Sequence, residues 1–290
     1  MTLHTALQQA CKLLEEESVA APRLTAEVLL CHALGCERAY FYSHPEAELS
    51  DVVRIHYGRY LHERLAGKPT QYITGRQEFY GRDFLVTPEV LIPRPETEYV
   101  VEAALALVPA PRRMVDVGCG SGAIAVTLSL EMHADVLATD ISVDALAVAA
   151  KNAKKLNARV EFVACDLASA FAPASLDLVV SNPPYVALAD APGLQREVRD
   201  YEPHVALFAG ETGLEIYARL VQEAERVLRP GGALVMELGF KTSEAVRAML
   251  GSVWQDVRIV PDLAGIPRVL TAGLGRMQVA DRHGVEWCQT

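Results

Sequence analysis

The fold is decided by residues 115–123, which read VDVGCGSGA. Residues 114–117 are apolar enough for a buried parallel strand, and the apolar run that starts at Ala123 predicts a helix. The glycines between them predict a tight turn, because glycine adopts backbone conformations that other residues avoid and lets the main chain approach a ligand. The positive end of the helix dipole favours electron-rich groups at this turn. The stretch therefore predicts a strand, a ligand-binding glycine loop and a helix.

Acidic and amide side chains follow the next predicted strands. Asp140 ends a strand about 20 residues beyond the glycine loop, at a position suited to ribose hydroxyls. Asp166 ends another strand, and residues 176–181 lead to Asn182. Because the carboxyl ends of parallel strands meet at one edge of a sheet, we expect these side chains around one ligand-binding rim. The alternation of strands and helices from Met114 onward predicts an α/β fold with right-handed crossovers.

Residues 182–185, Asn-Pro-Pro-Tyr, are suited to hold a planar nitrogen. The Asn182 side-chain oxygen can accept one N–H of an amide or of a base amino group, and a neighbouring backbone carbonyl can accept the other. Pro183 makes that carbonyl rigid, and Tyr185 offers a flat face for stacking. Two such bonds orient the nitrogen toward an electrophile. The alternative interpretation is a proline-rich turn that closes a strand.

The glycine loop also fits a second class of protein. Gly118, Gly120 and Ala123, with an acid about 20 residues later, match the dinucleotide fingerprint of a dehydrogenase. The carboxylate of Asp116 lies just ahead of the glycines, where it suits an ammonium or sulfonium group better than a pyrophosphate. Together with the Asn182 motif, this carboxylate favours S-adenosylmethionine over NAD as the cofactor.

The chain ahead of this region divides into two further parts. Residues 1–70 show helical periodicity, with one helix predicted over residues 50–66. Residues 71–92 are rich in aromatic and β-prone side chains, with Gly81 at the turn of a predicted hairpin. We therefore expect a small all-helical N-terminal domain, a β-hairpin linker and a cofactor-binding domain over residues 93–290.

The composition is that of a large, acidic, globular protein. The chain has 290 residues and a formal net charge of −10, which argues against broad non-specific contacts with nucleic acid. Its six cysteines show neither a C-x-x-C pair nor zinc spacing, so we expect free thiols and no metal site. No apolar run reaches the roughly 18 residues that cross a bilayer, and the N-terminus lacks a signal-peptide pattern. We therefore expect a cytoplasmic protein without a membrane partner.

The motifs resemble one known family over nearly the whole chain. The glycine-rich stretch after Asp116, the acid at Asp140 and the Asn182 motif resemble class I, Rossmann-like methyltransferases that use S-adenosylmethionine to modify amide or amine nitrogens. Further segments narrow the resemblance to the HemK/PrmC family of peptide chain release factor glutamine N5-methyltransferases. These segments are QYITG at 71–75, EFYG at 78–81, LIPRPETE at 91–98, EP at 202–203, AL at 206–207 and GL at 213–214.

The resemblance implies a reaction and a role for each site residue. The reaction is methyl transfer from S-adenosylmethionine to the glutamine side-chain amide in the Gly-Gly-Gln motif of release factors, which modulates translation termination. Asn182 and the Pro183 carbonyl would accept the two N–H groups, and Pro184 and Tyr185 would complete the substrate site. The N-terminal helical domain would help to dock the release factor. The implied cofactor-binding residues are Asp116, Gly118, Cys119, Gly120, Ser121, Gly122, Asp140 at the ribose, Asp166 and Leu167 at the adenine, and Asn182.

Alternatives remain open at the level of sequence. An enzyme that methylates adenine or cytosine in nucleic acid could use the same Asn182 clamp, but it would need a basic groove and a target-recognition segment, and this acidic chain shows neither. A non-catalytic adaptor that binds the cofactor would not need Asn182. Glu237, at the end of a predicted strand, is either a carboxylate of the site or a solvated strand end.

Overall fold

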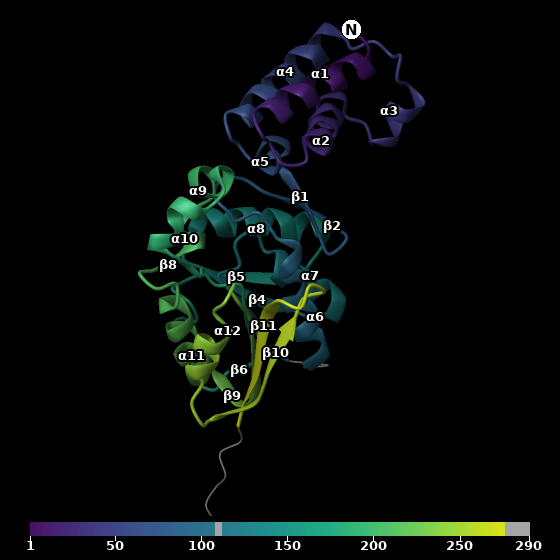
Figure 1. Cartoon of the computed structure of the whole chain (residues 1–290). Coiled ribbons are helices and arrows are strands. Elements are labelled where there is room, and N and C mark those ends of the chain that lie inside the picture. Colours follow the sequence, from purple (N-terminus) through teal and green to yellow (C-terminus); the bar gives the residue numbers. More distant parts are fainter. Residues whose placement is uncertain (108–111, 276–290) are drawn as a thin grey trace, which may run out of the picture.

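A computed structural model describes residues 1–107 and 112–275. Figure 1 shows a cluster of N-terminal helices at one end of the molecule and a larger α/β body at the other, with a short helix and a hairpin between them. This arrangement confirms the expected α/β class and the expected N-terminal helical region. The boundaries of the three expected domains stay a prediction.

The N-terminal helices enclose a hydrophobic core of their own. On the first helix the buried side chains recur every three or four residues, which places them on one face. Thr2 and Ser50 cap two of the helices, because their side-chain oxygens accept from the backbone N–H of Thr5 at 3.2 Å and of Val53 at 3.3 Å. The helix predicted over residues 50–66 is confirmed as α4. The helices are α1 (Leu3–Glu16), α2 (Pro22–Leu34), α3 (Ala39–Ser43) and α4 (Asp51–Leu65).

The segment after α4 differs in part from the expectation. The β-prone stretch at its start forms a short helix, α5 (Thr70–Thr74), so the prediction of extended chain there was wrong. The predicted hairpin follows as β1 (Arg76–Phe79) and β2 (Arg82–Leu85). Tyr80 and Gly81 form its turn with φ values of 51° and 69°. Positive φ at both central residues is what a two-residue turn needs to match the twist of the two strands.

The hairpin is packed against the α/β body. Phe79 and Phe84 are buried in the core of that body, with their ring centroids 6.0 Å apart. Asn152, on α8 (Val143–Leu156), accepts from Leu85 N at 2.7 Å and donates to Leu85 O at 2.9 Å. The side-chain amide therefore pairs with the open edge of β2 as another strand would.

The α/β body is built on a seven-stranded sheet in the order β10-β11-β9-β6-β3-β4-β5. The strands β3, β4, β5, β6 and β9 are parallel. At the C-terminal end, β11 pairs antiparallel with β9, and β10 pairs antiparallel with β11. The chain leaves β3 toward β4 on one side and leaves β6 toward β9 on the other side. The switch point of the sheet therefore lies between the carboxyl ends of the neighbours β3 and β6. The strands are β3 (Met114–Val117), β4 (Val136–Asp140), β5 (Val160–Ala164), β6 (Leu176–Ser181), β9 (Leu228–Glu237), β10 (Trp254–Pro261) and β11 (Pro267–Leu274).

Helices cover both faces of this sheet, and each face has its own core. One core contains side chains of α6 (Glu98–Leu107), α7 (Ala123–Met132) and α8 together with the hairpin phenylalanines. The other contains side chains of α11 (Glu215–Val227) and α12 (Ser243–Ala248). Burial of apolar side chains on both faces explains why the central strands read as continuous apolar runs.

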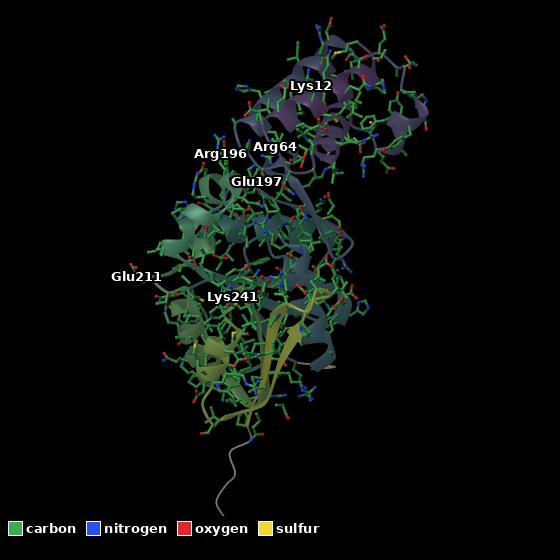
Figure 2. The ribbon with its side chains drawn as sticks, in the orientation of Figure 1. Lys12, Arg64, Arg196, Glu197, Glu211 and Lys241 are labelled. Atoms are coloured by element: carbon green, nitrogen blue, oxygen red, sulfur yellow. The ribbon has the colours of Figure 1, made fainter. Side chains whose placement is uncertain are left out.

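The chain between β6 and α11 forms an insertion that the sequence reading did not predict. It runs through β7 (Val186–Ala187), the 3-10 helix η2 (Leu188–Gly193), α9 (Arg196–Tyr201), α10 (His204–Leu207) and β8 (Phe208–Gly210). Figure 2 shows Arg64 of α4 and Glu197 of α9 at the junction with the N-terminal helices, where they form an ion pair of 2.5 Å. Tyr201 donates to the backbone oxygen of Ala66 at 3.1 Å. The insertion therefore holds the two parts of the molecule together.

Two further observations concern the described residues only. Cys11, Cys31, Cys36, Cys119 and Cys165 are free thiols, while Cys288 lies outside the described residues. Across residues 1–107 and 112–275, no helix has both the length and the apolar character that a membrane crossing requires.

Candidate active site

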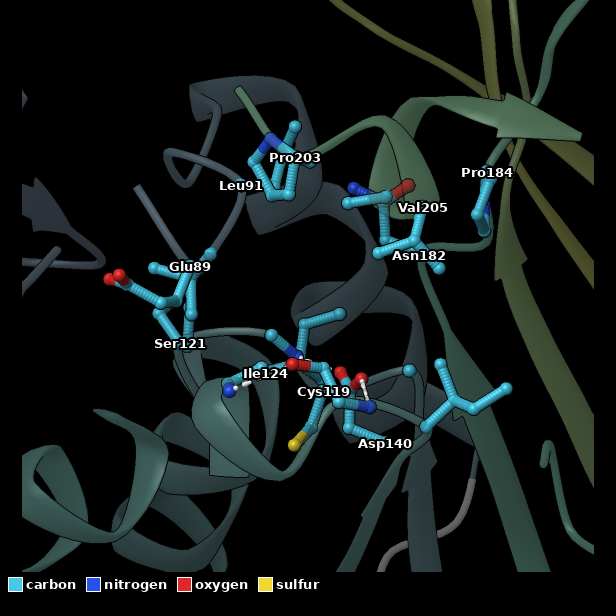
Figure 3. Close-up of a pocket in the computed structure, with 18 of the residues that line it drawn as sticks. Glu89, Leu91, Cys119, Ser121, Ile124, Asp140, Asn182, Pro184, Pro203 and Val205 are labelled. Carbon is cyan, nitrogen blue, oxygen red and sulfur yellow. Dashed lines mark hydrogen bonds between the residues drawn. The ribbon is translucent and has the colours of Figure 1, made fainter. Parts of the chain in front are cut away.

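A cavity opens at the carboxyl ends of β3, β4 and β6, on both sides of the switch point. It contains about 1110 Å³ of space, part of it open to solvent. Clefts that bind small molecules have volumes of roughly 300–1,000 Å³, so this cavity is large enough for such a ligand. Figure 3 shows Cys119, Ser121, Asp140 and Asn182 around it. Of the predicted site residues, nine line the cavity: Gly118, Cys119, Gly120, Ser121, Asp140, Asp166, Leu167, Asn182 and Pro184.

The glycine loop is tied to the neighbouring strand by its backbone. Gly118 N and Cys119 N both donate to Thr139 O at 2.8 Å. Gly120 has a φ of 52°, and a side chain added there would meet nothing within 4 Å, because that side of the loop faces the cavity. Burial raises the pKa of the Cys119 thiol, which therefore lines the cavity as a neutral group. The loop presents backbone and small neutral side chains to a ligand.

Asp140 braces the loop as well as facing the cavity. Its Oδ2 accepts from Gly120 N and its Oδ1 from Ser142 N, both at 2.9 Å. Each carboxylate oxygen has a further lone pair. The two oxygens can therefore accept two hydroxyl hydrogens from a ligand while they hold the loop in place.

Asp166 and Leu167 form the adjoining wall. Leu167 has a left-handed backbone with φ of 49°, and its carbonyl accepts from Thr139 Oγ1 at 2.8 Å. Asp166 is exposed and forms an ion pair of 2.5 Å with Arg219 of α11, which also lines the cavity. This wall combines an apolar side chain with a charged pair at the mouth.

Asn182 is held by a chain of hydrogen bonds that leads into the protein interior. Its Nδ2 donates to Thr97 Oγ1 at 3.0 Å, and Thr97 Oγ1 donates to Glu237 Oε2 at 2.6 Å. Within the described residues, no hydrogen bond to Asn182 Oδ1 is present. The side-chain oxygen is therefore available to a ligand while the nitrogen is bound to the protein.

Glu237 is a buried carboxylate outside the cavity wall, so neither of the two interpretations of this residue is correct. Only 2% of it is exposed, so it is no solvated strand end, and it does not line the cavity. Burial raises its pKa to about 7, against the lowering effects of the Thr97 hydrogen bond and the Arg268 charge. Its contact with the site runs through Thr97.

Four predicted site residues do not line the cavity: Asp116, Gly122, Pro183 and Tyr185. The Asp116 carboxylate is fully buried below the glycine loop, where Oδ2 accepts from Ala125 N at 3.0 Å and Oδ1 has no partner among residues 1–107 and 112–275. Burial raises its pKa to about 7. The structure therefore does not place this carboxylate in the cavity wall, where a direct contact with an ammonium or sulfonium group would need it.

Gly122 and Pro183 support the site from behind. Gly122 precedes α7, and a Cβ there would lie 3.1 Å from the Cβ of Ala149 on α8, so it allows the two helices to pack closely. Pro183 is buried between its two neighbours in the motif. Their predicted roles at the cofactor and at the substrate stay predictions.

Tyr185 packs away from the cavity. A Cβ on Gly239 would lie 2.8 Å from the ring atom Cδ2 of Tyr185, so the ring lies directly on the backbone of this glycine. The Tyr185 hydroxyl donates to Glu237 Oε1 at 3.4 Å, and burial raises its pKa above the ordinary value. Stacking of Tyr185 on a substrate stays a prediction, since the ring is already packed against the protein.

The sequence reading missed residues that complete the cavity. Half of them come from the segment between β2 and α6 and from the insertion after β6, and the others lie after β4 and β5 and in α7, α8 and α11. No local pattern marks the residues of the first two segments as ligand-binding. These two segments are joined by an ion pair between the half-buried Arg94 and the buried Glu202. Such contacts cross more than 100 residues of sequence, so spacing could not reveal them. The missed residues are Glu89, Val90, Leu91, Pro93, Thr97, Ala123, Ile124, Ile141, Ser142, Ala145, Cys165, Pro203, Val205, Ala206, Ile216 and Arg219.

The fold is shared with solved methyltransferases. A methyltransferase from Pyrococcus furiosus matches with a TM-score of 0.52 and 18% identity, covering 68% of this chain and 91% of that one. The hMettl16 catalytic domain, solved with an RNA hairpin, matches with a TM-score of 0.53 and 19% identity, covering 74% and 81%. The fold, with a cavity at its switch point, is therefore that of the class I methyltransferases.

Two family models and several curated relatives are more specific. The model of the PrmC N-terminal domain matches residues 5–75, and that of the methyltransferase small domain matches residues 100–195. The release factor glutamine methyltransferase of Koribacter versatilis is 48% identical over 93% of this chain and 98% of its own length. That of Nitratidesulfovibrio vulgaris is 44% identical over 96% and 97%. The chain belongs to the family of release factor glutamine methyltransferases.

Proposed function

We propose that this protein transfers a methyl group from S-adenosylmethionine to the side-chain amide nitrogen of glutamine in the Gly-Gly-Gln motif of peptide chain release factors. Membership of the family supports the reaction and the substrate class. The structural observation that carries the proposal is Asn182, whose nitrogen is bound to Thr97 while its oxygen is left for a ligand. Such an oxygen is an acceptor for the N–H of a substrate amide.

The cavity is suited to the cofactor. The glycine loop lets a ligand approach the backbone, Asp140 offers acceptors for two ribose hydroxyls, and Leu167 with Asp166 offers an apolar and a polar contact for an adenine. When bound, S-adenosylmethionine supplies a methyl group on a positively charged sulfur. Asp116 would act on this positive charge from below the loop rather than by direct contact, because it does not line the cavity.

The residues around Asn182 would act by orienting the substrate. Asn182 Oδ1 and the Pro183 carbonyl would each accept one N–H of the glutamine amide, which reduces the conjugation of its nitrogen and directs the lone pair. Pro184 would line the path of the Gly-Gly-Gln loop. The amide proton leaves to solvent after alkylation, so no side chain has to act as a base. Catalysis in this proposal rests on orientation and on electrostatic stabilisation of the developing positive charge.

The N-terminal helices would help to dock the release factor, as part of a three-domain organisation over residues 1–70, 71–92 and 93–290. The ion pair of Arg64 with Glu197 supports this, because it couples the helices to the insertion that borders the cavity. Such a substrate would place the enzyme in the cytoplasm, where translation takes place. We propose no contact with nucleic acid.

The proposed function is tested with methyl-labelled S-adenosylmethionine and an unmethylated release factor. Two comparison substrates are used. One is a release factor whose Gly-Gly-Gln motif is changed to Gly-Gly-Ala, and the other is unmethylated duplex DNA. We expect label on the glutamine alone, located by mass spectrometry. Asn182→Ala should lower kcat by about 10²–10³-fold, as loss of one oriented hydrogen-bonding group does, while calorimetry shows cofactor binding to be retained. Label on DNA, or an unmodified glutamine despite cofactor binding, would refute the proposal.

A further inference from the structure

We propose that Glu237 and Thr97 are positioning residues that fix the direction of the Asn182 carboxamide, so that its oxygen and not its nitrogen faces the substrate. The inference rests on the proposed function, in which Asn182 accepts an N–H of the glutamine amide. It assigns a role to a buried carboxylate that does not line the cavity. The three residues come from η1 (Pro95–Thr97), from the end of β6 and from the end of β9.

The geometry is that of a continuous relay. Asn182 Nδ2 lies 3.0 Å from Thr97 Oγ1, which lies 2.6 Å from Glu237 Oε2. Thr97 is 4% exposed and Glu237 is 2% exposed, so water does not compete for these bonds. In such surroundings a hydrogen bond is stronger, and an incorrect pairing is costly.

The direction of the relay follows from the count of protons. A threonine hydroxyl has one hydrogen, and an ionised carboxylate can only accept. The Thr97 hydrogen therefore points to Glu237, which leaves only lone pairs on Thr97 Oγ1 toward Asn182. The carboxamide must answer with its NH2 group, and its oxygen then turns to the cavity. The opposite rotamer would place two acceptors against each other.

A neutral Glu237 would remove this constraint. The protonated carboxyl can donate to Thr97 Oγ1, and the Thr97 hydrogen is then free to donate to Asn182 Oδ1. The carboxamide would turn its NH2 group to the cavity, where it opposes the N–H groups of the substrate amide. Activity therefore requires the ionised form of Glu237, which makes the charge of this residue a control on the substrate site.

The charge of Glu237 changes near neutral pH. The groups that face it are Thr97 and Glu96 on η1, Tyr185 after β6, Tyr217 on α11, and Arg268 on β11. The charge of Arg94 also acts to lower the pKa of Tyr185. Burial raises the pKa of Glu237 to about 7, and Glu96 acts in the same direction, while Arg268 and the two hydroxyl hydrogen bonds act against it. The ionised fraction, and with it the activity, should therefore rise between pH 6 and pH 8.

The kinetic experiment measures kcat/KM for the release factor from pH 6 to pH 8.5 in four variants. Thr97→Val removes the hydroxyl at constant shape and should lower kcat/KM by about tenfold or more and flatten the pH profile, as loss of a buried hydrogen bond does. Thr97→Ser, which keeps the hydroxyl, should recover most of that loss. Glu237→Gln should lose the rise near pH 7. The matched control is Thr127→Val, which removes a buried hydroxyl that has no hydrogen-bond partner in the described part of the chain and should leave kcat/KM unchanged.

A purely structural role predicts other results. In that case Thr97→Val would lower the melting temperature and the affinity for the cofactor, and the wild-type pH profile would persist in all variants. The double variant Thr97→Val with Glu237→Gln adds a further comparison. It should be no slower than Thr97→Val alone, because both changes interrupt one relay. Additive effects, or an unchanged pH profile in Glu237→Gln, would overturn the inference.

A measurement without substrate separates this inference from the proposed function. The side-chain NH2 resonances of Asn182, assigned by their absence in Asn182→Ala, should shift with pH around 7 in the wild-type protein and should not do so in Glu237→Gln. Resonances that do not titrate in the wild-type protein would overturn the relay even if the release factor is methylated. A clear titration in a protein that fails to methylate any release factor would refute the proposed function and leave the relay intact.

Discussion

Asp140 holds the glycine loop and, in the proposed function, also binds the ribose with the same carboxylate. Its oxygens accept from Gly120 N and Ser142 N, which fixes the glycine loop to the end of β4. The residue lines the cavity, where its remaining lone pairs would accept from a ribose. A residue that holds a loop and also binds a ligand should affect ligand affinity more than protein stability, because the backbone N–H groups can turn to water when the carboxylate is lost.

Asp140→Ala should weaken binding of S-adenosylmethionine by about tenfold to a hundredfold, since one or two hydrogen bonds to a charged group are lost at about 1.5–3 kcal/mol each, in part replaced by water. Calorimetric titration of the cofactor measures this change. Asp144→Asn, an exposed acid in the first turn of α8, is the matched control and should bind as the wild type does. An unchanged dissociation constant in Asp140→Ala would show that the carboxylate does not contact the ligand.

The end of β9 is the element that supports the Asn182 motif. Glu237 anchors Thr97 and Tyr185 through its side chain, and Tyr217 donates to its backbone oxygen at 3.0 Å. The next residues pass directly under the Tyr185 ring, where Gly239 leaves room for it. Gly239 N also donates to the Tyr217 hydroxyl at 2.9 Å. One strand end thus determines the positions of several groups that belong to other elements.

Gly239→Ala should displace the Tyr185 ring, because the new Cβ would lie 2.8 Å from its Cδ2 and 2.9 Å from its Cγ. We expect a loss of stability of about 1–3 kcal/mol, as is usual for overpacking, and at least a tenfold loss of methylation with cofactor affinity retained. Urea unfolding and the methylation assay measure the two effects. Gly251→Ala, where a Cβ meets nothing within 4 Å, controls for the general effect of losing a glycine. Equal behaviour of both variants would contradict the packing argument.

Two sets of contacts join the N-terminal helices and the hairpin to the α/β body. The hairpin phenylalanines pack into the α/β core, and α9 contacts α4 through the pair of Arg64 and Glu197. The α/β body also buries the carboxylates of Asp116 and Glu237, and burial raises the pKa of each to about 7. Such groups make the stability of the fold depend on pH, because the folded state retains their protons to a higher pH than the unfolded state does.

Asp116→Asn should change how stability depends on pH. Burial raises the pKa of Asp116 from 3.8 to about 7 in the folded protein, so the folded state binds more protons between these values and stability falls as pH rises through them. The slope from one such group is at most about 1.4 kcal/mol per pH unit. The variant lacks this contribution, so its unfolding free energy relative to the wild type should increase from pH 4 to pH 7. Urea unfolding across this range measures it, and parallel curves would contradict the prediction.

The alternation of strands and helices and the position of the cavity could be predicted from the sequence. Apolar runs followed by glycine, Asp140, Asp166 and Asn182 are local patterns, and a parallel sheet brings strand ends to one rim whatever the helices between them are. The helix at residues 70–74 was missed because packing decided its conformation against its β propensity. The insertion after β6 was missed because its helices are too short to show a period.

The α/β class, the glycine loop, the Asn182 motif and the resemblance that leads to the family can all be read from the amino-acid sequence, since each depends on residues adjacent in the chain or on strand ends that must meet. The surroundings of these residues became known from the three-dimensional structure. Asp116 and Tyr185 lie outside the cavity wall, and Asn182 is connected to Thr97, 85 residues away, which is in turn connected to Glu237, 140 residues from Thr97. Burial and hydrogen bonding depend on which distant elements pack together, and that packing leaves no pattern in the spacing of residues.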